Sequence, residues 1–255
     1  MNRKKVLFIA KWYPDKHDNM LGLFIQKHAM AVQLYHHVTV IYITADKTLP
    51  PGKIQIDEQT HSGIHEIRIY FGKKTNELLN AFEYGWCYWK ALQIAFKKSG
   101  SFDIVHVHVL SRTALPAIWL KATKGIPYII TEHWSRYLPV NLSNGSYSGN
   151  LRKWFTGVAV RLSSGVTTVT LNLSEAMKNL GLKSTYYITP NIADINDFFP
   201  LQNPSNNPTR KFVHVSCFDE GAKNINGIIN AIEVLSKERN DFQLEIIGDG
   251  KILKL

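Results

Sequence analysis

Short apolar runs rich in β-branched residues alternate with segments of helical periodicity, and this alternation is the strongest constraint on the fold. The apolar runs are residues 5–10, 38–43, 64–70, 104–109, 128–131, 166–169 and 186–189. The helical segments are residues 23–35, 78–98, 114–124, 151–163 and 173–180. Strands that are apolar throughout are buried on both faces, so helices must cover both sides of their sheet. The sequence therefore predicts an α/β domain with a doubly wound, mostly parallel sheet.

A second unit is predicted after a linker. Residues 194–210 contain three prolines and four asparagines without periodicity, which is typical of a linker. A strand at 212–215, a helix at 225–238 and a strand at 243–247 follow. Two strands and one helix cannot cover both faces of a parallel sheet, so we expect a chain truncated within a second, Rossmann-like domain. We predict domains at 1–200 and 201–255.

The excess positive charge lies in the first domain. Residues 1–200 hold 23 basic and 13 acidic side chains, whereas residues 201–255 hold 7 of each. A positive field attracts nucleic acid, an anionic membrane surface or a phosphorylated substrate. A generally basic, soluble surface is the alternative interpretation.

The cysteine content and the N-terminus indicate a cytoplasmic protein. Only two cysteines are present, Cys87 and Cys217, which suggests a reducing compartment. No apolar run reaches the roughly 18 residues that a membrane-spanning helix needs. The short apolar run at 6–10 is ended by Lys11 before a secretion signal is complete.

Two features of the first domain are candidates for a site. His106 and His108 are two residues apart on a predicted strand and so share a face. Paired imidazoles can bind zinc, but the remaining ligands of a zinc site have no counterpart in the sequence, so we favour hydrogen-bonded histidines and expect no metal. Gly22 precedes a predicted helix, whose N-terminus can bind an anion. The absence of GxGxxG and of a P-loop argues against NAD-dependent and ATPase functions.

Two segments combine aromatic and basic residues, and two interpretations of them remain open. Such helices bind anionic membrane surfaces, although aromatic residues at helical spacing also pack cores. The first segment holds Phe82, Tyr84, Trp86, Tyr88, Trp89 and Phe96 near Lys90, Lys97 and Lys98. In the second, Arg152, Lys153 and Arg161 flank Trp154 and Phe155.

The second unit offers candidate phosphate ligands. Lys223 is predicted to open its helix, and Gly248-Asp249-Gly250 follows its second strand. Ligands of open α/β sheets bind beyond the carboxyl ends of the strands, where both elements fall. A lysine there meets phosphates, or is simply a solvated residue at a helix start.

Taken together, these segments resemble a GT-B glycosyltransferase of family 4. The resemblance covers nearly the whole chain, in the order of the family's elements. After the first strand and its Gly22 loop, the matching fragments are FDIVHVH (102–108), GIPYIITEH (125–133), VTTVTLNLSEAM (166–177), ITPNIADINDFFP (188–200), KNINGIINAI (223–232) and LEIIGDG (244–250).

The resemblance implies roles for individual residues. His133 resembles the family's histidine that contacts the donor sugar and is the catalytic candidate. Lys223 resembles the lysine that binds the donor diphosphate. Gly22, Gly248 and Gly250 are further donor-binding candidates. His106, His108 and Asn191 are candidates for the acceptor site or for structural roles at the sheet edge.

Two departures from the family pattern bear on activity. The family usually has an arginine six residues before the lysine, where this sequence has Cys217. The family's two glutamates, separated by seven residues, would lie beyond residue 255. We therefore expect most of the nucleotide pocket to be missing from this chain, or to be supplied by a partner chain.

The resemblance implies sugar transfer from a UDP- or GDP-sugar, with retained anomeric configuration and no obligatory cofactor or metal. The acceptor would be a glycan or a lipid-linked precursor in cell-surface polysaccharide synthesis, with peripheral contact to the anionic inner face of the membrane and no nucleic-acid partner. The alternative is a truncated or split, non-catalytic module that binds an acceptor or a partner. A sugar-nucleotide epimerase of the same architecture is a more remote alternative.

Overall fold

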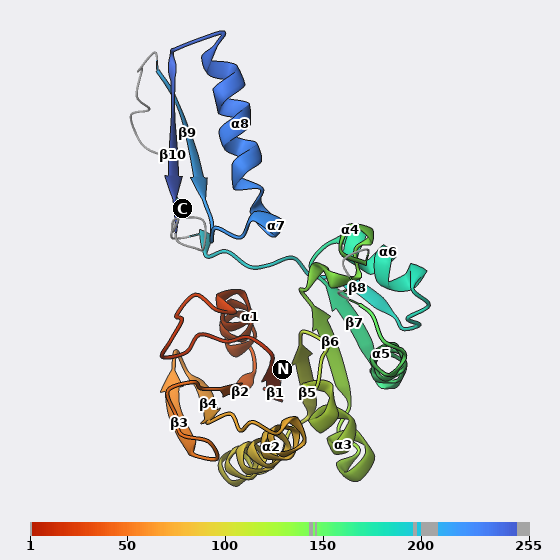
Figure 1. The fold of residues 1–255 in the computed structure, drawn as a ribbon. Helices are drawn as coiled ribbons and strands as arrows, with labels where there is room; N and C mark the ends of the chain where they lie inside the picture. The colour runs from red at the N-terminus through yellow and green to blue at the C-terminus, as the bar shows by residue number, and fades with distance from the viewer. Residues whose placement is uncertain (1, 143–144, 146, 196–197, 200–208, 249–255) are drawn as a thin grey trace. The chain divides into compact units, whose positions relative to one another are not determined.

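The computed structural model describes residues 2–142, 145, 147–195, 198–199 and 209–248. The chain divides into two compact units, Met1–Asp194 and Ile195–Leu255 (Figure 1). The predicted boundary, between 200 and 201, falls six residues after the observed division.

The first unit contains an eight-stranded sheet in the order β3-β4-β2-β1-β5-β6-β7-β8. All neighbouring strands are parallel except β3 and β4, which are antiparallel. The strands are β1 (Lys5–Ala10), β2 (His37–Ala45), β3 (Ile54–His61), β4 (Ile64–Phe71), β5 (Ile104–His108), β6 (Tyr128–Glu132), β7 (Gly165–Thr168) and β8 (Tyr186–Ile188). The predicted α/β fold with a mostly parallel sheet is confirmed.

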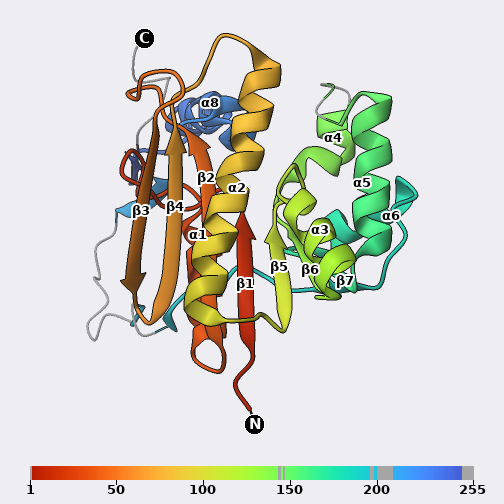
Figure 2. The same cartoon turned by 90° about the horizontal axis from the view of Figure 1, so that it is seen from below.

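Helices cover both faces of this sheet. One face carries α1 (Leu23–Gln33), and the other carries α2 (Glu77–Ser99), α3 (Ala114–Lys124) and α5 (Asn150–Leu162), as Figures 1 and 2 show. The short η1 (Ser135–Tyr137) and α4 (Pro139–Leu142) precede α5, and α6 (Leu171–Asn179) follows β7. Alternate side chains of β1 enter two separate apolar clusters, Leu7 and Ile9 on the α2 side and Val6, Phe8 and Ala10 on the α1 side.

Sequence periodicity missed the edge strand β3. Its sequence, IQIDEQTH, alternates isoleucine with polar residues only at its start, and most of its side chains are exposed. It pairs with β4 alone, through an antiparallel register from Ile54 opposite Phe71 to His61 opposite Ile64. An edge strand with solvent on its outer side does not need an apolar run, which explains why the pattern failed here.

A buried ion pair fixes the loop that follows β1. In β4, Arg68 Nη2 lies 2.7 Å from Glu66 Oε2, and both side chains are almost fully buried. Tyr13 donates its hydroxyl proton to Glu66 Oε1 at 2.5 Å, and Arg68 Nε donates to the Pro14 carbonyl at 2.8 Å. These bonds pair the two buried charges with each other and at the same time hold Tyr13 and Pro14 against β4.

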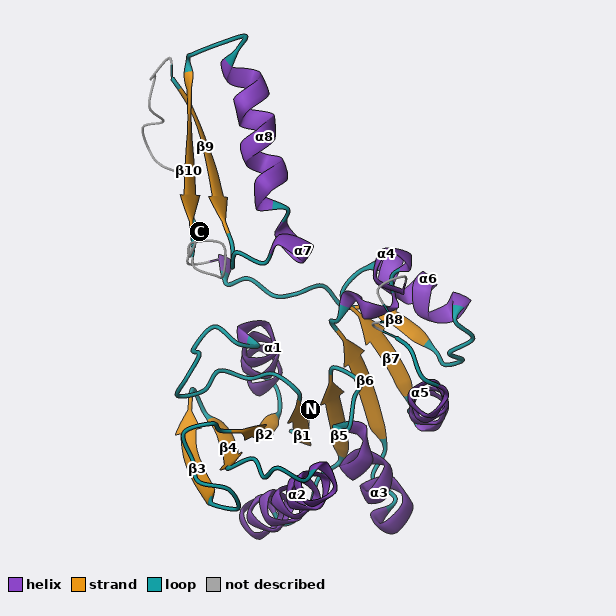
Figure 3. Cartoon of the chain, in the orientation of Figure 1, coloured by secondary structure: helices purple, strands orange, loops and turns teal. Residues whose placement is uncertain are grey.

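The second unit has two parallel strands, β9 (Arg210–Val215) and β10 (Phe242–Ile247), with α7 (Glu220–Lys223) and α8 (Ile225–Ser236) between them (Figure 3). The prediction that Lys223 opens the helix was wrong in detail. Lys223 is the last residue of α7, and Asn224 then adopts a left-handed conformation, with φ of 50°, before α8 begins. The polar Asp219 side chain caps α7 instead, by accepting a hydrogen bond from the Gly221 amide.

Gly22 packs against the backbone of the loop after β1. Its φ is +66°, and a Cβ placed on it would lie 2.4 Å from the Trp12 carbonyl carbon. Gly125 has a similar φ of +69°, but a Cβ there would meet no atom within 4 Å. Substitutions at the two glycines therefore distinguish two contributions to the free energy of unfolding. Both include the cost of a left-handed backbone, and only the one at Gly22 adds the cost of a steric overlap.

We predict that Gly22→Ala lowers the free energy of unfolding by at least ~2 kcal/mol more than Gly125→Ala does. Both variants lose the conformational freedom of glycine, at about 1 kcal/mol, but only Gly22→Ala forces the Trp12 backbone to move. Urea unfolding followed by circular dichroism measures both values. Equal losses in the two variants would contradict the proposed overlap.

Candidate functional site

Histidines gather at the carboxyl edge of the first sheet. His108 is the last residue of β5, where it pairs with Ala10 of β1 and Thr131 of β6, and His133 follows β6 directly. The two-residue spacing predicted a shared face for His106 and His108, and their ring centroids are 4.1 Å apart. The strand register therefore brings together three of the predicted site residues.

A fourth histidine, His28, joins the group from α1. Its ring centroid lies 5.5 Å from that of His133 and 5.9 Å from that of His108. Sequence reasoning missed this residue. The stripe that His28 shares with Ile25 and Ala29 predicts its burial but not its contact with β5 and β6. We call His28, His106, His108 and His133 the histidine cluster.

Hydrogen bonds fix the orientation of three rings in the cluster. His106 Nε2 and Thr131 Oγ1 are 2.6 Å apart, and Thr131 also bonds to Thr167 on the next strand. His108 Nδ1 and His133 Nε2 are 3.2 Å apart. Two neutral imidazoles can form this bond only if one nitrogen carries the proton and the other accepts it, so the pair couples the tautomer of His133 to that of His108.

Burial keeps the histidine cluster neutral. Loss of hydration, followed by the neighbouring histidines, lowers the pKa of His106 to about 3 and the pKa of His108 well below its usual value. Burial and then His28 lower the pKa of His133 to about 3, and burial lowers that of His28. A side-chain hydrogen bond to Asn191 raises the pKa of both His28 and His133 and so opposes part of this lowering. Asn191 is thus adjacent to the cluster.

Glu132 organises the loops on either side of His133. Its buried carboxylate accepts hydrogen bonds from the amides of His133 and Trp134, at 3.0 and 2.9 Å, and from the Leu110 amide at 3.1 Å. Arg136 Nη2 donates to the Leu110 carbonyl. The loops after β5 and β6 are therefore joined through two buried charges. Sequence reasoning did not assign either residue a role.

The backbone next to His108 is strained. Val109 is fully buried and has a φ of 66°, a conformation that is unfavourable for a β-branched residue. Its amide donates to the Thr131 carbonyl at 2.9 Å, and its carbonyl accepts from the Thr113 hydroxyl at 2.8 Å. These two bonds hold the turn that ends β5 directly after His108.

Three cations lie around the same edge. Burial lowers the pKa of Lys11, which follows β1, and the charges of Arg112 and Arg136 lower it further. The Lys11 amide donates to the His108 carbonyl at 3.2 Å, so the backbone of Lys11 is bonded directly to the backbone of one member of the histidine cluster. The edge thus combines neutral imidazoles with positive charges, which suits a ligand that carries both hydroxyl and phosphate groups.

The remaining predicted site residues are outside the histidine cluster. Gly22 and Gly248 also have a structural reason to be glycine, because the backbone of another residue lies close to each. Gly22 begins the helix that carries His28, and its closest contacts are with the Trp12 backbone. Lys223 is exposed in the second unit, and a Cβ on Gly248 of that unit would overlap the Ser216 carbonyl. Gly250 lies outside the described residues. The donor-binding roles of these residues stay predictions.

The described ranges bear on a metal site and on a membrane-spanning helix. These ranges contain no group of three or more histidine, cysteine, aspartate or glutamate side chains placed to hold a metal ion. No helix of the described chain is long and apolar enough to cross a membrane.

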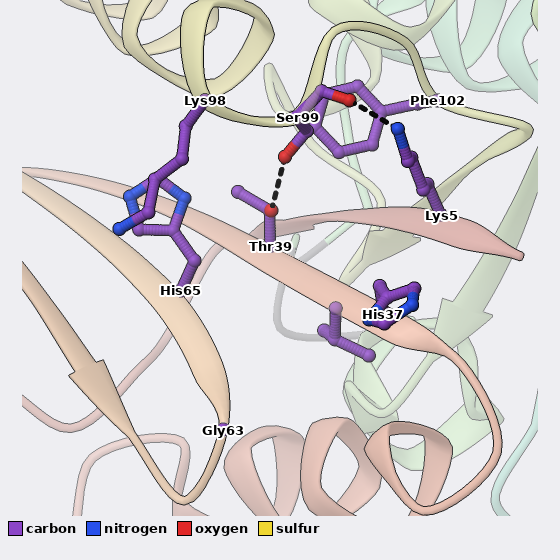
Figure 4. A pocket seen from close by; sticks show the side chains of 9 residues that line it. Lys5, His37, Thr39, Gly63, His65, Lys98, Ser99 and Phe102 are labelled. Atoms are coloured by element: carbon purple, nitrogen blue, oxygen red, sulfur yellow. Dashed lines mark hydrogen bonds between the residues drawn. The ribbon is translucent and has the colours of Figure 1, made fainter. Parts of the chain in front are cut away.

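A cavity of about 290 Å³ lies at the opposite, amino-terminal end of the strands (Figure 4). Several of its polar groups already have partners. Lys5 Nζ donates to the Ser99 carbonyl at 2.6 Å, and Thr39 bonds to the Ser99 hydroxyl at 3.4 Å. His65 Nε2 is 2.9 Å from Glu58 Oε1. None of the predicted site residues lines this cavity, so we place the functional site at the carboxyl edge.

Comparison with protein families identifies the chain. The model of Glycosyltransferase Family 4 matches residues 29–197. The chain belongs to this family. The matched region contains the strand β5 with His106 and His108, the loop of His133 and residue Asn191. Gly22 precedes it, and Lys223 and Gly248 follow it.

Solved structures of glycosyltransferases share the fold. Sucrose-phosphate synthase from Thermosynechococcus elongatus matches with a TM-score of 0.69 at 14% identity, over 96% of this chain and 62% of its own. A lipopolysaccharide outer core galactosyltransferase matches with a TM-score of 0.57 at 14% identity, over 98% and 62%. An α,α-trehalose-phosphate synthase from Burkholderia xenovorans, in complex with glucose-6-phosphate, matches with a TM-score of 0.56 at 11% identity, over 98% and 67%.

The family 4 chain thus spans less than two thirds of the length of two of these proteins. At identities of this size the likeness extends to the fold and not to the substrate. A search of curated protein sequences gave no match.

We predict that the stability of this family 4 chain falls as the pH decreases from about 6.5 to 5. In the unfolded chain the clustered histidines take up protons near pH 6.5, whereas in the folded chain their lowered pKa values keep them neutral, so acid favours unfolding. Replacing one member, in His106→Gln, should make the dependence shallower by up to about 1.4 kcal/mol per pH unit. Urea unfolding at each pH gives the slope.

The matched control is His61→Gln, because His61 is exposed on β3. This variant should keep the pH dependence of the wild type. The same slope for His106→Gln and the wild type would show that His106 takes up a proton equally well in both states.

Proposed function

We propose that this family 4 chain forms the acceptor side of a retaining glycosyltransferase that transfers a sugar from a UDP- or GDP-sugar. The observation that carries the proposal is the position of His133 within the matched family region, at the carboxyl edge of the sheet and bonded to His108. Ligands of open parallel sheets bind at this edge. A neutral imidazole can exchange hydrogen bonds with sugar hydroxyls as donor or acceptor.

The chain's own residues supply three effects in this proposal. His133 contacts the donor sugar, and its orientation is set by His108 and by the Glu132 carboxylate. Lys11 and Arg112 attract the negative charge of a phosphorylated substrate. Lys223 stabilises the charge that develops on the departing diphosphate. No metal or cofactor is required by this scheme.

The proposed acceptor is a glycan or a lipid-linked precursor of a cell-surface polysaccharide, and the proposed location is the cytoplasm at the inner face of the membrane. The basic first domain supports this assignment, because 23 basic and 13 acidic residues lie before residue 201. The structural likeness to a lipopolysaccharide galactosyltransferase is compatible with it at the level of fold.

We expect His133→Ala to reduce sugar transfer about 100-fold or more, through loss of a contact to the donor sugar. The measurement follows nucleotide release and sugar incorporation over a panel of UDP- and GDP-sugars, and NMR of the product shows whether the anomeric configuration is retained. His61→Ala, at an exposed position on β3, is the control. An unchanged rate in His133→Ala would remove the proposed role.

Lys223→Ala should also reduce the rate about 100-fold, because the diphosphate leaving group would lose a cation. Lys237→Ala is the matched control, since Lys237 is exposed in the same unit and forms an ion pair with Glu233, at 3.4 Å. Equal rates in both variants would contradict the diphosphate role of Lys223.

A non-catalytic binding module is the second candidate, because Cys217 stands where the family usually has an arginine for the donor diphosphate. Such a module would bind an acceptor or a partner chain and would release no nucleotide in the same assay. Steady turnover by the 255-residue chain would exclude it.

A further inference from the structure

Three helices on one face of the first sheet carry exposed aromatic side chains. On α2, Leu78, Phe82, Trp86 and Trp89 recur at intervals of four, four and three residues, which places them along one stripe. Phe82 is 75% exposed, and the exposed rings of Trp86 and Trp89 stack with centroids 4.7 Å apart. Packing does not explain this stripe, because α2 already buries its other side, including Cys87, against the sheet.

The neighbouring helices continue this apolar surface. Leu115 and Trp119 of α3 are about half exposed, and Leu151 and Trp154 of α5 are 78% and 65% exposed. The helices α2, α3 and α5 lie on the same face of the sheet (Figure 2), and their buried sides enter one common cluster. We call the outward side of these helices the aromatic face. It contains Phe82, Trp86, Trp89, Trp119 and Trp154.

Charge around the aromatic face is strongly positive. Residues 104–174 contain seven lysines and arginines but only one acidic residue, Glu132, which is fully buried. On α2 the two acidic residues are matched by lysines, Glu77 by Lys73 and Glu83 by Lys74. Lys90 on α2 and Lys153 on α5 then add positive charge next to the exposed tryptophans. The surface therefore combines apolar side chains with cations, as anionic lipid requires.

The aromatic face reaches the edge of the sheet that holds the histidine cluster. Leu78, Phe82, Leu115, Leu151 and Trp154 all lie in the first two turns of their helices. In βα units these turns lie at the carboxyl ends of the strands. The charge of Arg112 reaches both regions. After burial, it lowers the pKa of Lys11, which is beside His108, and after the larger effect of Lys73 it lowers the pKa of Glu77 at the start of α2.

We propose that the aromatic face binds the surface of a bilayer that contains anionic phospholipid. Tryptophan and phenylalanine side chains enter the interfacial region, and the lysines and arginines contact the lipid phosphates. The proposal extends the proposed function, because a lipid-linked acceptor held in the same bilayer would then approach the carboxyl edge that carries His133. A water-soluble partner protein or a second copy of this chain are the competing occupants.

Vesicle binding tests the proposal without any sugar donor or acceptor. The full chain is mixed with vesicles of phosphatidylcholine alone, or with 30% phosphatidylglycerol as the probe, and is then sedimented. We expect at least tenfold tighter binding to the anionic vesicles, weaker binding as salt rises from about 0.1 to 0.5 M because charges are screened, and a blue shift of tryptophan fluorescence. No binding to either vesicle would overturn the proposal.

A triple variant, Phe82→Ser with Trp86→Ser and Trp89→Ser, should bind anionic vesicles at least tenfold more weakly. The matched control is Leu34→Ser with Tyr35→Ser, which removes side chains that are 71% and 72% exposed at the end of α1, on the other face. The control should bind within twofold of the wild type. Equal binding by the triple variant and the wild type, with circular dichroism showing both folded, would overturn the assignment to this face.

Two further measurements separate the competing explanations. Lys90→Glu with Lys153→Glu should weaken binding to anionic vesicles at least threefold, and an unchanged affinity would overturn the electrostatic part. Self-association in lipid-free sedimentation, lost in the triple variant and accompanied by no vesicle binding, would assign the face to a second copy. Transfer to a water-soluble acceptor should be retained by the triple variant, so failure of the proposed function is detected independently.

Discussion

The parallel register of β5 between β1 and β6 determines where the chemistry of this chain can lie. Ala10, His108 and Thr131 occupy one row across the three strands, and the loops that follow contribute Lys11 and His133. A slip of one residue in β5 would turn both of its histidines toward α2 and α3 and bring valines to the opposite face. The face on which His106 and His108 lie is therefore set by the backbone hydrogen bonds between the strands, and side-chain contacts only refine their positions.

Within this edge, neutral and charged groups are kept apart. The imidazoles are buried or half-buried and remain neutral, while Lys11 and Arg112 lie where the strands end. Glu132 and Arg136 do not simply add charge, because their hydrogen bonds join the loops after β5 and β6. The arrangement provides a hydrogen-bonding surface beside a positive field, held by a strained turn at Val109.

Much of the fold follows from local sequence, whereas the site follows only in part. Buried parallel strands such as β1 need apolar residues at every position, so the pattern is visible in a single sequence. The shared face of His106 and His108 follows from strand geometry in the same way. His28 could not be joined to them, because its proximity depends on how α1 crosses the sheet. Glu132 was equally hidden, since a carboxylate bound by backbone amides has no sequence signature.

In the second unit too, sequence periodicity did not place a candidate site residue correctly. A lysine before a helical pattern suggests a helix start, but the left-handed Asn224 ends one short helix and begins another, so Lys223 lies at a junction. That conformation is decided by backbone and capping interactions over a few residues, which periodicity does not resolve.

The edge strands of the first sheet limit how the described part of this unit can associate with other chains. At one end, β3 presents Asp57 and Glu58 and runs antiparallel to its neighbour, and at the other end β8 is only three residues long. Charged or very short edge strands are poor templates for strand addition, so another chain gains little by extending this sheet. We therefore expect contacts with other molecules to be made by side chains of helices and loops and not by backbone pairing.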